Sequence, residues 1–146
     1  MKRVNRVSII LLLMVHILFI VSCELKRNNP LDPNGNTNIK EPPKVMGLIA
    51  TGSSAGVINK YAELTWSKND KYTDGYYVYI GFAYNSSYLR LPNPVLQTPD
   101  NSPTITIRVS DLTPQFYYFK VSAFKNYGSA GTLEGSLSEW ARALVN

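Results

Sequence analysis

Short runs of alternating apolar and polar residues fill the chain from Pro42 onward. Six of these runs are strand candidates: residues 45–50, 62–66, 76–82, 104–109, 117–124 and 141–145. Alternation of this kind turns one face of a strand toward a core and the other toward solvent. No stretch in this part of the sequence keeps a helical period, so the pattern predicts an all-β domain.

The segments between these runs are rich in Gly, Asn, Asp, Ser and Pro, residues that favour turns. They are residues 52–54, 69–71, 85–87, 99–101 and 128–131. About seven short strands in about 105 residues are typical of a sandwich of two antiparallel sheets. We therefore predict a seven-stranded Greek-key β-sandwich over residues 42–146.

Several of these segments together resemble a fibronectin type III domain. The resemblance is carried by Pro42-Pro43 with residues 48–50, by 62–66, by 74–79, by 104–107 with 112–114, and by 117–123 with 126–128. It implies an immunoglobulin-like sandwich with Trp66 in the core of the second strand. It also implies a corner tyrosine that bonds to the backbone, for which the family's spacing of six residues from Leu112 points to Tyr118. We prefer Tyr117, because it continues inward with Phe119 and Val121 in a period of two.

The same alternation predicts a core of inward-facing side chains: Leu48, Leu64, Trp66, Tyr76, Val78, Ile105, Ile107, Leu112, Tyr117, Phe119 and Val121. Burial of one such side chain contributes about 1.5–3 kcal/mol to stability.

The first 22 residues have the pattern of an export signal. Three basic residues, Lys2, Arg3 and Arg6, precede an apolar run over residues 9–21 that only His16 interrupts. As a helix this run would span about 20 Å, short of a bilayer core of about 30 Å. We expect residues 1–22 to be a signal peptide that is removed, in preference to a short uncleaved anchor.

The signal ends with Ile20-Val21-Ser22-Cys23, which resembles the lipobox of bacterial lipoproteins. The resemblance implies cleavage before Cys23, a diacylglycerol on its sulfur, and acylation of the new amino terminus. Two or three acyl chains hold a protein stably on a membrane. We therefore expect a lipid-anchored protein in the bacterial cell membrane or outer membrane, on the periplasmic face or at the cell surface.

Residues 23–41 follow as the lipidated Cys23 and a polar segment rich in Asn and Pro. Such a segment has too little apolar surface to offset the entropy of ordering it, so we expect a flexible linker. The stretch at residues 32–36 lacks the Gly and Glu that an EF-hand calcium loop needs at its sixth and twelfth positions, where Thr37 and Pro43 stand. A plain turn is the better interpretation.

Most of the net charge of +5 belongs to the signal peptide and not to the rest of the chain. The signal carries three of the positive charges, and residues 42–146 hold nine Lys or Arg against seven Asp or Glu. No basic cluster stands out among them, so we expect no nucleic-acid partner.

Catalytic chemistry is not expected either. The single histidine, His16, lies in the signal peptide, and the single cysteine, Cys23, is the lipidation site. A histidine-dependent triad or a His/Cys metal site is therefore impossible in the mature chain. Asp70 and Asp74 in one loop are better explained as turn residues than as an acid/base pair. We predict no enzyme activity, no catalytic residues, no cofactor and no metal.

The better functional candidate is an aromatic sheet face. If Tyr76 and Tyr117 point inward, alternation turns Tyr77, Tyr79, Tyr118 and Lys120 outward. Their strands are neighbours in the fibronectin type III fold, so these four residues form the candidate binding face, with Tyr84 and Tyr88 at its margin. Tyrosine is enriched at recognition surfaces, although it also simply suits exposed strands.

These features lead to two functional hypotheses. The first is a membrane-anchored envelope lipoprotein whose domain binds a protein or a glycan, through either the tyrosine face or a long loop over residues 126–138. The alternative is a non-catalytic structural or accessory subunit of a larger envelope complex. The fold by itself does not choose between them, because this sandwich hosts many functions.

Overall fold

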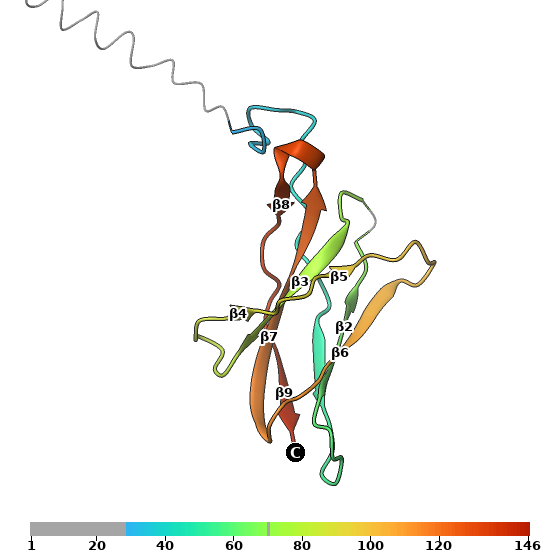
Figure 1. Cartoon of the computed structure of the whole chain (residues 1–146), viewed down its shortest axis with the longest axis vertical. Coiled ribbons are helices and arrows are strands. Elements are labelled where there is room, and N and C mark those ends of the chain that lie inside the picture. The colour runs from blue at the N-terminus through green and yellow to red at the C-terminus, as the bar shows by residue number, and fades with distance from the viewer. Residues whose placement is uncertain (1–28, 70) are drawn as a thin grey trace, which may run out of the picture.

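Two antiparallel sheets pack face to face in the structure, a computed structural model that describes residues 29–69 and 71–146 (Figure 1). The smaller sheet has the order β1-β2-β6, formed by β1 (Ile49–Gly52), β2 (Ala62–Ser67) and β6 (Thr104–Val109). The larger sheet has the order β4-β3-β7-β8, with β5 also paired to β3 and β9 to β7. Its strands are β3 (Gly75–Gly81), β4 (Leu89–Arg90), β5 (Val95–Leu96), β7 (Gln115–Asn126), β8 (Thr132–Glu134) and β9 (Ala141–Val145). The predicted all-β sandwich is confirmed.

The core lies between the two sheets and follows the predicted alternation. Seven of the predicted core residues are buried: Leu64, Trp66, Tyr76, Val78, Tyr117, Phe119 and Val121. The other four, Leu48, Ile105, Ile107 and Leu112, are partly buried and pack against them. At the centre the Trp66 ring meets the Tyr76 ring edge-on, with centroids 5.4 Å apart, which is a favoured arrangement for aromatic pairs.

Tyr117 is the corner tyrosine. Its hydroxyl oxygen accepts a hydrogen bond from the Thr113 backbone N–H at 3.0 Å and another from Gln115 Nε2 at 2.8 Å. The ring itself is buried, whereas Tyr118 lies on the opposite face of β7. The period of two therefore located this residue better than its distance from Leu112 did.

The first strand starts later than predicted. We expected it over residues 45–50, but β1 runs over Ile49–Gly52. The reason is Gly47, whose φ of +69° takes the backbone out of the extended region. The segment before it still contacts β2, because the Ser67 N–H donates to the Met46 carbonyl at 3.0 Å and Val45 is buried in the core.

The prediction of a long loop over residues 126–138 is wrong. A short 3₁₀ helix, η2 (Gly128–Ala130), and strand β8 lie within it, so only residues 127–131 separate β7 from β8. The pairing then changes register between Phe124↔Glu134 and Phe119↔Ala141. From Phe124 to Phe119 is five residues along β7, whereas from Glu134 to Ala141 is seven residues along the segment that pairs with it. Two extra residues therefore bulge out of this segment between β8 and β9.

The bulge is held to β7 by Ser138. Its hydroxyl oxygen accepts from the Val121 N–H at 2.9 Å and donates to the Glu139 carbonyl at 2.7 Å. The Ser138 N–H donates to the Val121 carbonyl at 2.8 Å. A serine can replace a missing ladder partner in this way, because its hydroxyl both donates and accepts.

Residues 29–41 form a folded cap, and the predicted flexible linker up to Glu41 does not describe them. Tyr127, beside η2, accepts through its hydroxyl from the Lys40 N–H at 2.8 Å and donates to the Lys40 carbonyl at 2.7 Å. Ile39 is only 5% exposed. One tyrosine hydroxyl and one isoleucine thus supply the packing that the segment's average composition does not suggest.

The turn predicted at Asp32 is confirmed inside this cap. The Gly35 N–H donates to the Asp32 carbonyl at 3.1 Å, and the Asn34 N–H donates to Asp32 Oδ1 at 2.9 Å. Figure 1 places the cap beside the β7–β8 hairpin, at the end of the domain away from residue 146. The predicted signal peptide and Cys23 lie outside the described residues. Across residues 29–69 and 71–146, no helix is long and apolar enough to cross a membrane.

Candidate binding face

The outer face of the larger sheet carries all four residues of the predicted binding face. Tyr79 lies opposite Lys120, and Tyr77 opposite Ser122, in the pairing of β3 with β7. Tyr118 lies opposite Gly81 on one side and Arg142 of β9 on the other. Pairs directly opposite on one sheet face have Cβ atoms about 5 Å apart, so the face is continuous across β3, β7 and β9.

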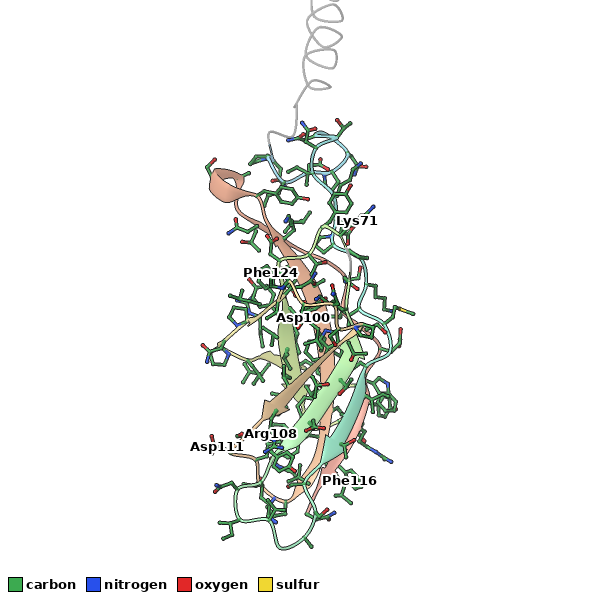
Figure 2. The ribbon with its side chains drawn as sticks, turned by 90° about the vertical axis from the view of Figure 1, so that its right-hand side faces the viewer. Lys71, Asp100, Arg108, Asp111, Phe116 and Phe124 are labelled. Carbon is green, nitrogen blue, oxygen red and sulfur yellow. The ribbon has the colours of Figure 1, made fainter. Side chains whose placement is uncertain are left out.

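This face divides into two parts along β7. Phe124 marks one part and Phe116 the other, and Figure 2 shows the two rings well apart along the length of the domain. We define the closed half as Tyr77, Tyr79, Arg90, Ser122, Phe124 and Glu134. We define the open half as Tyr84, Tyr88, Phe116, Tyr118, Lys120, Trp140 and Arg142.

In the closed half, side chains satisfy one another around Glu134. The Tyr79 and Ser122 hydroxyls both donate to Glu134 Oε1, each at 2.5 Å. Arg90 Nη1 lies 3.8 Å from Glu134 Oε2. Burial, and then the hydrogen bond to Glu134, raises the pKa of Tyr79 above its ordinary value, so the phenol stays protonated and remains a donor.

The rings of the closed half are covered as well. Tyr77 stacks on Phe124 with centroids 4.5 Å apart, and the Arg90 guanidinium lies 4.5 Å from the Tyr77 ring centroid. Phe124 is buried although it belongs to the outer face. Little aromatic surface is therefore left for a partner here.

The open half presents three of its rings, Tyr84, Phe116 and Trp140, to solvent, whereas Tyr88 and Tyr118 are partly buried. Trp140 meets Tyr118 edge-on with centroids 5.6 Å apart, and Tyr84 lies 6.3 Å from Trp140. The exposed fractions are 60% for Tyr84, 47% for Trp140 and 45% for Phe116. Large aromatic side chains are seldom left this exposed in one contiguous group without a role in recognition.

The cations of the open half lie on rings. Lys120 Nζ is 4.7 Å from the Tyr88 ring centroid, and Arg142 Cζ is 4.8 Å from that of Phe116. Within the described residues neither cation has a carboxylate oxygen within 4.0 Å. The nearby acid, Glu139, is held by Lys44 at 2.6 Å, and this hydrogen bond lowers the pKa of Glu139 from its ordinary value.

The predicted binding face thus splits between the two halves. Tyr77 and Tyr79 belong to the closed half, and Tyr118 and Lys120 to the open half. Sequence reasoning missed Trp140 and Arg142 as members of the face. The signal was present, because alternation through Ala141 and Ala143, both buried, turns their neighbours at 140 and 142 outward.

Asp70 lies outside the described residues, and the other acidic loop residues engage basic groups or lie apart. Asp100 and Asp111 lie apart in Figure 2. Hydrogen bonds from Lys68 and Thr98 lower the pKa of Asp100 to about 2. Asp74 is bound to Lys125 Nζ at 2.5 Å and to the Asn126 N–H at 2.9 Å. Within the described part of the chain, no three His, Cys, Asp or Glu side chains are grouped so as to hold a metal ion.

A separate cavity lies at the edge of the sandwich, between β5 and β6. Its volume is about 560 Å³, and its lining includes Val95, Ile107, Pro94 and Arg108. Arg108 there is already engaged by Glu63, at 3.8 Å, and by the Tyr61 ring. The cavity lacks the group of exposed rings that marks the open half, so its Arg108 is a suitable control for the cations of that half.

Comparison with known proteins supports the fold. No family model matches the chain, and no curated protein matches it. Among solved structures, the chain is similar to a Fn3-like protein from Clostridium thermocellum, with a TM-score of 0.50 and 24% identity over 73% of this chain and 96% of that chain. Together with the sheet order, this likeness shows a fibronectin type III-like domain.

Proposed function

We propose that this protein is a lipid-anchored component of the bacterial cell envelope whose fibronectin type III-like domain binds a protein or glycan through the open half of its larger sheet. The observation that carries the proposal is the group of exposed rings on this half: Tyr84 and Trp140, whose centroids lie 6.3 Å apart, and Phe116 on the same sheet face. Aromatic side chains in this setting offer a large contact area at low entropic cost.

The charges of the open half favour a ligand-binding module over a permanent subunit. Permanent interfaces resemble a domain core and are depleted of charge at their centre. Lys120 and Arg142 lie among the rings of the open half. A permanent apolar partner would have to desolvate both cations, which costs free energy unless they are paired. The accessory-subunit hypothesis is therefore the second choice.

The binding proposal is tested by removing the rings from each half separately. The full chain, purified in detergent, is applied to an array of envelope polysaccharides, host glycans and extracellular proteins. The variant Tyr84→Ser/Tyr118→Ser/Trp140→Ser should lose its captured ligand, whereas Tyr77→Ser in the closed half should retain it. Equal capture by wild type and the triple variant, with both folded by circular dichroism, would exclude the open half.

The membrane attachment is tested at Cys23. The proposal is supported by the basic start, the short apolar run and the Ile20-Val21-Ser22-Cys23 motif. Cells fed a clickable palmitate analogue should label the wild-type protein, and Cys23→Ala should abolish the label and leave the leader uncleaved. Label retained in Cys23→Ala would refute lipidation at this residue. Protease treatment of intact cells then tells the cell surface from the periplasmic face.

A further inference from the structure

We infer that the ligand of the open half is an acidic glycan, a chain of sugars that bear carboxylates. This inference rests on the proposed function, because it names the class of ligand for the same surface. It is carried by the pairing of unshielded cations with exposed rings, a combination that the closed half lacks.

Charge complementarity indicates an anionic ligand. The side chains on and beside the open half comprise Lys120, Arg142 and Lys44 against the single carboxylate of Glu139, and that carboxylate is taken by Lys44. Lys120 lies within Coulombic reach of Glu139, but among the described residues no carboxylate oxygen lies within 4.0 Å of Lys120 or Arg142. In the closed half, by contrast, Arg90 already faces Glu134. Hydrogen bonds from a cation to a carboxylate are about twice as strong as neutral ones.

The two cations are near neighbours on one sheet face. Arg142 lies directly opposite Tyr118 in the pairing of β7 with β9, and Lys120 is two residues further along β7 on the same face. Such diagonal neighbours have Cβ atoms about 7 Å apart. Tyr118 and the edge-on Trp140 lie beside them, so an apolar platform and two positive charges share one surface.

The rings favour sugars as the repeating unit. The C–H groups of a pyranose ring form an apolar face that stacks on an exposed aromatic ring, while the hydroxyl groups at its edge remain in water. Trp140 and Tyr84 are both exposed enough to accept such a ring. The carboxylates of the same chain would then reach Lys120 and Arg142.

The paired backbone of β7 disfavours an acidic peptide. Extended peptides gain much of their affinity by adding a strand to a free sheet edge. On one side of β7 the backbone pairs with β3. On the other it pairs with β8 and β9, and between them Gly135 and Ser138 donate to the Ala123 and Val121 carbonyls. A peptide on this face would have side-chain contacts only.

The test compares three probes on the full chain in detergent: an oligogalacturonate, its methyl ester, and a poly-glutamate peptide. Isothermal titration calorimetry should show binding of the oligogalacturonate that weakens as salt is raised, and at least tenfold weaker binding of the ester. Lys120→Gln and Arg142→Gln should each weaken binding about tenfold, the loss of one charge-assisted contact. Trp140→Ala should do the same.

Arg90→Gln in the closed half and Arg108→Gln at the β5–β6 cavity are matched controls, because each removes one cation elsewhere, and both should leave binding unchanged. Equal affinity for the ester, tighter binding of poly-glutamate, an equal loss in the controls, or no binding of oligogalacturonate would each overturn the acidic-glycan inference.

The proposed function is judged separately, by whether the triple ring variant loses its captured ligand on the array. A neutral glycan or a protein captured there would uphold the proposed function and overturn this inference.

Discussion

Both halves of the outer sheet face contain tyrosines, a phenylalanine and an arginine, but only the closed half contains an acidic residue. In the closed half, Glu134 accepts from Tyr79 and Ser122 and faces Arg90. In the open half, no carboxylate is placed to do this for Lys120 or Arg142 within the described residues. One acidic residue at the centre of a group of tyrosines therefore decides whether their polar atoms contact one another or remain available to a ligand.

The comparison also teaches how to interpret a tyrosine-rich sheet. Tyr77 and Tyr118 occupy outward positions on neighbouring strands, so alternation predicts both equally as binding residues. Tyr77 is covered by Phe124 and Arg90, whereas Tyr118 meets an exposed tryptophan. Outward direction is therefore necessary for a binding residue and not sufficient, because a neighbour on the same face can cover the ring.

Both halves rest on the same core, so the largest effect should come from Trp66→Ala. The ring is fully buried, and its removal should cost about 3–5 kcal/mol and unfold both halves together in a urea titration. Among the described residues Trp66 Nε1 has no hydrogen-bond partner, so Trp66→Phe should cost clearly less. A Trp66→Ala variant that melts within a few degrees of wild type would contradict the central place of this ring.

The next largest effect is expected from Glu134→Ala in the closed half. The change leaves the two hydroxyls and the guanidinium that Glu134 engages without their acceptor. This loss should lower the free energy of unfolding by about 1–2 kcal/mol. Glu134→Gln keeps an acceptor and should recover part of that loss. The melting temperature by differential scanning calorimetry is the measurement. Unchanged melting of Glu134→Ala would mean that the closed half is not held together by this residue.

A smaller and more local effect should follow Tyr127→Phe in the cap. The variant loses the two hydrogen bonds between the Tyr127 hydroxyl and Lys40. This loss should lower the stability of the cap by about 1 kcal/mol. Amide hydrogen exchange should accelerate at Lys40 and leave β3 and β7 as protected as before. Tyr72→Phe, at an exposed ring far along the sequence, is the matched control. Exchange at Lys40 that stays unchanged in Tyr127→Phe would show that the cap is held by other contacts.

The smallest effect on stability should come from Trp140→Ala, and this prediction separates the halves most directly. Trp140 is 47% exposed, so truncation should change the free energy of unfolding by less than about 1 kcal/mol. Binding of the ligand captured on the array should nevertheless weaken by about tenfold. If Trp140→Ala destabilises the protein as much as Glu134→Ala does, the open half is a structural surface like the closed one.

Much of the domain could be predicted because strand alternation is a local property. The core positions around Trp66 and Phe119 and the choice of Tyr117 as corner residue follow from a period of two. The first strand was misplaced because a single glycine, Gly47, takes up a positive φ that the apolar pattern does not reveal. The cap was missed because its contacts join Lys40 to Tyr127, 87 residues away.

The sequence by itself determined the sandwich, most of its core, and the outward direction of Tyr77, Tyr79, Tyr118 and Lys120, since each of these depends only on neighbours along the chain. Only the tertiary structure decided that Glu134 closes one half of that face and that Trp140 and Arg142 complete the other. The physical reason is strand register: Glu134 lies opposite Phe124 before the two-residue bulge, and the bulge then places Arg142 opposite Tyr118. Alternation gives the outward direction of Trp140 and Arg142, but it does not record which residues of β7 they lie beside, because register depends on pairing between distant segments.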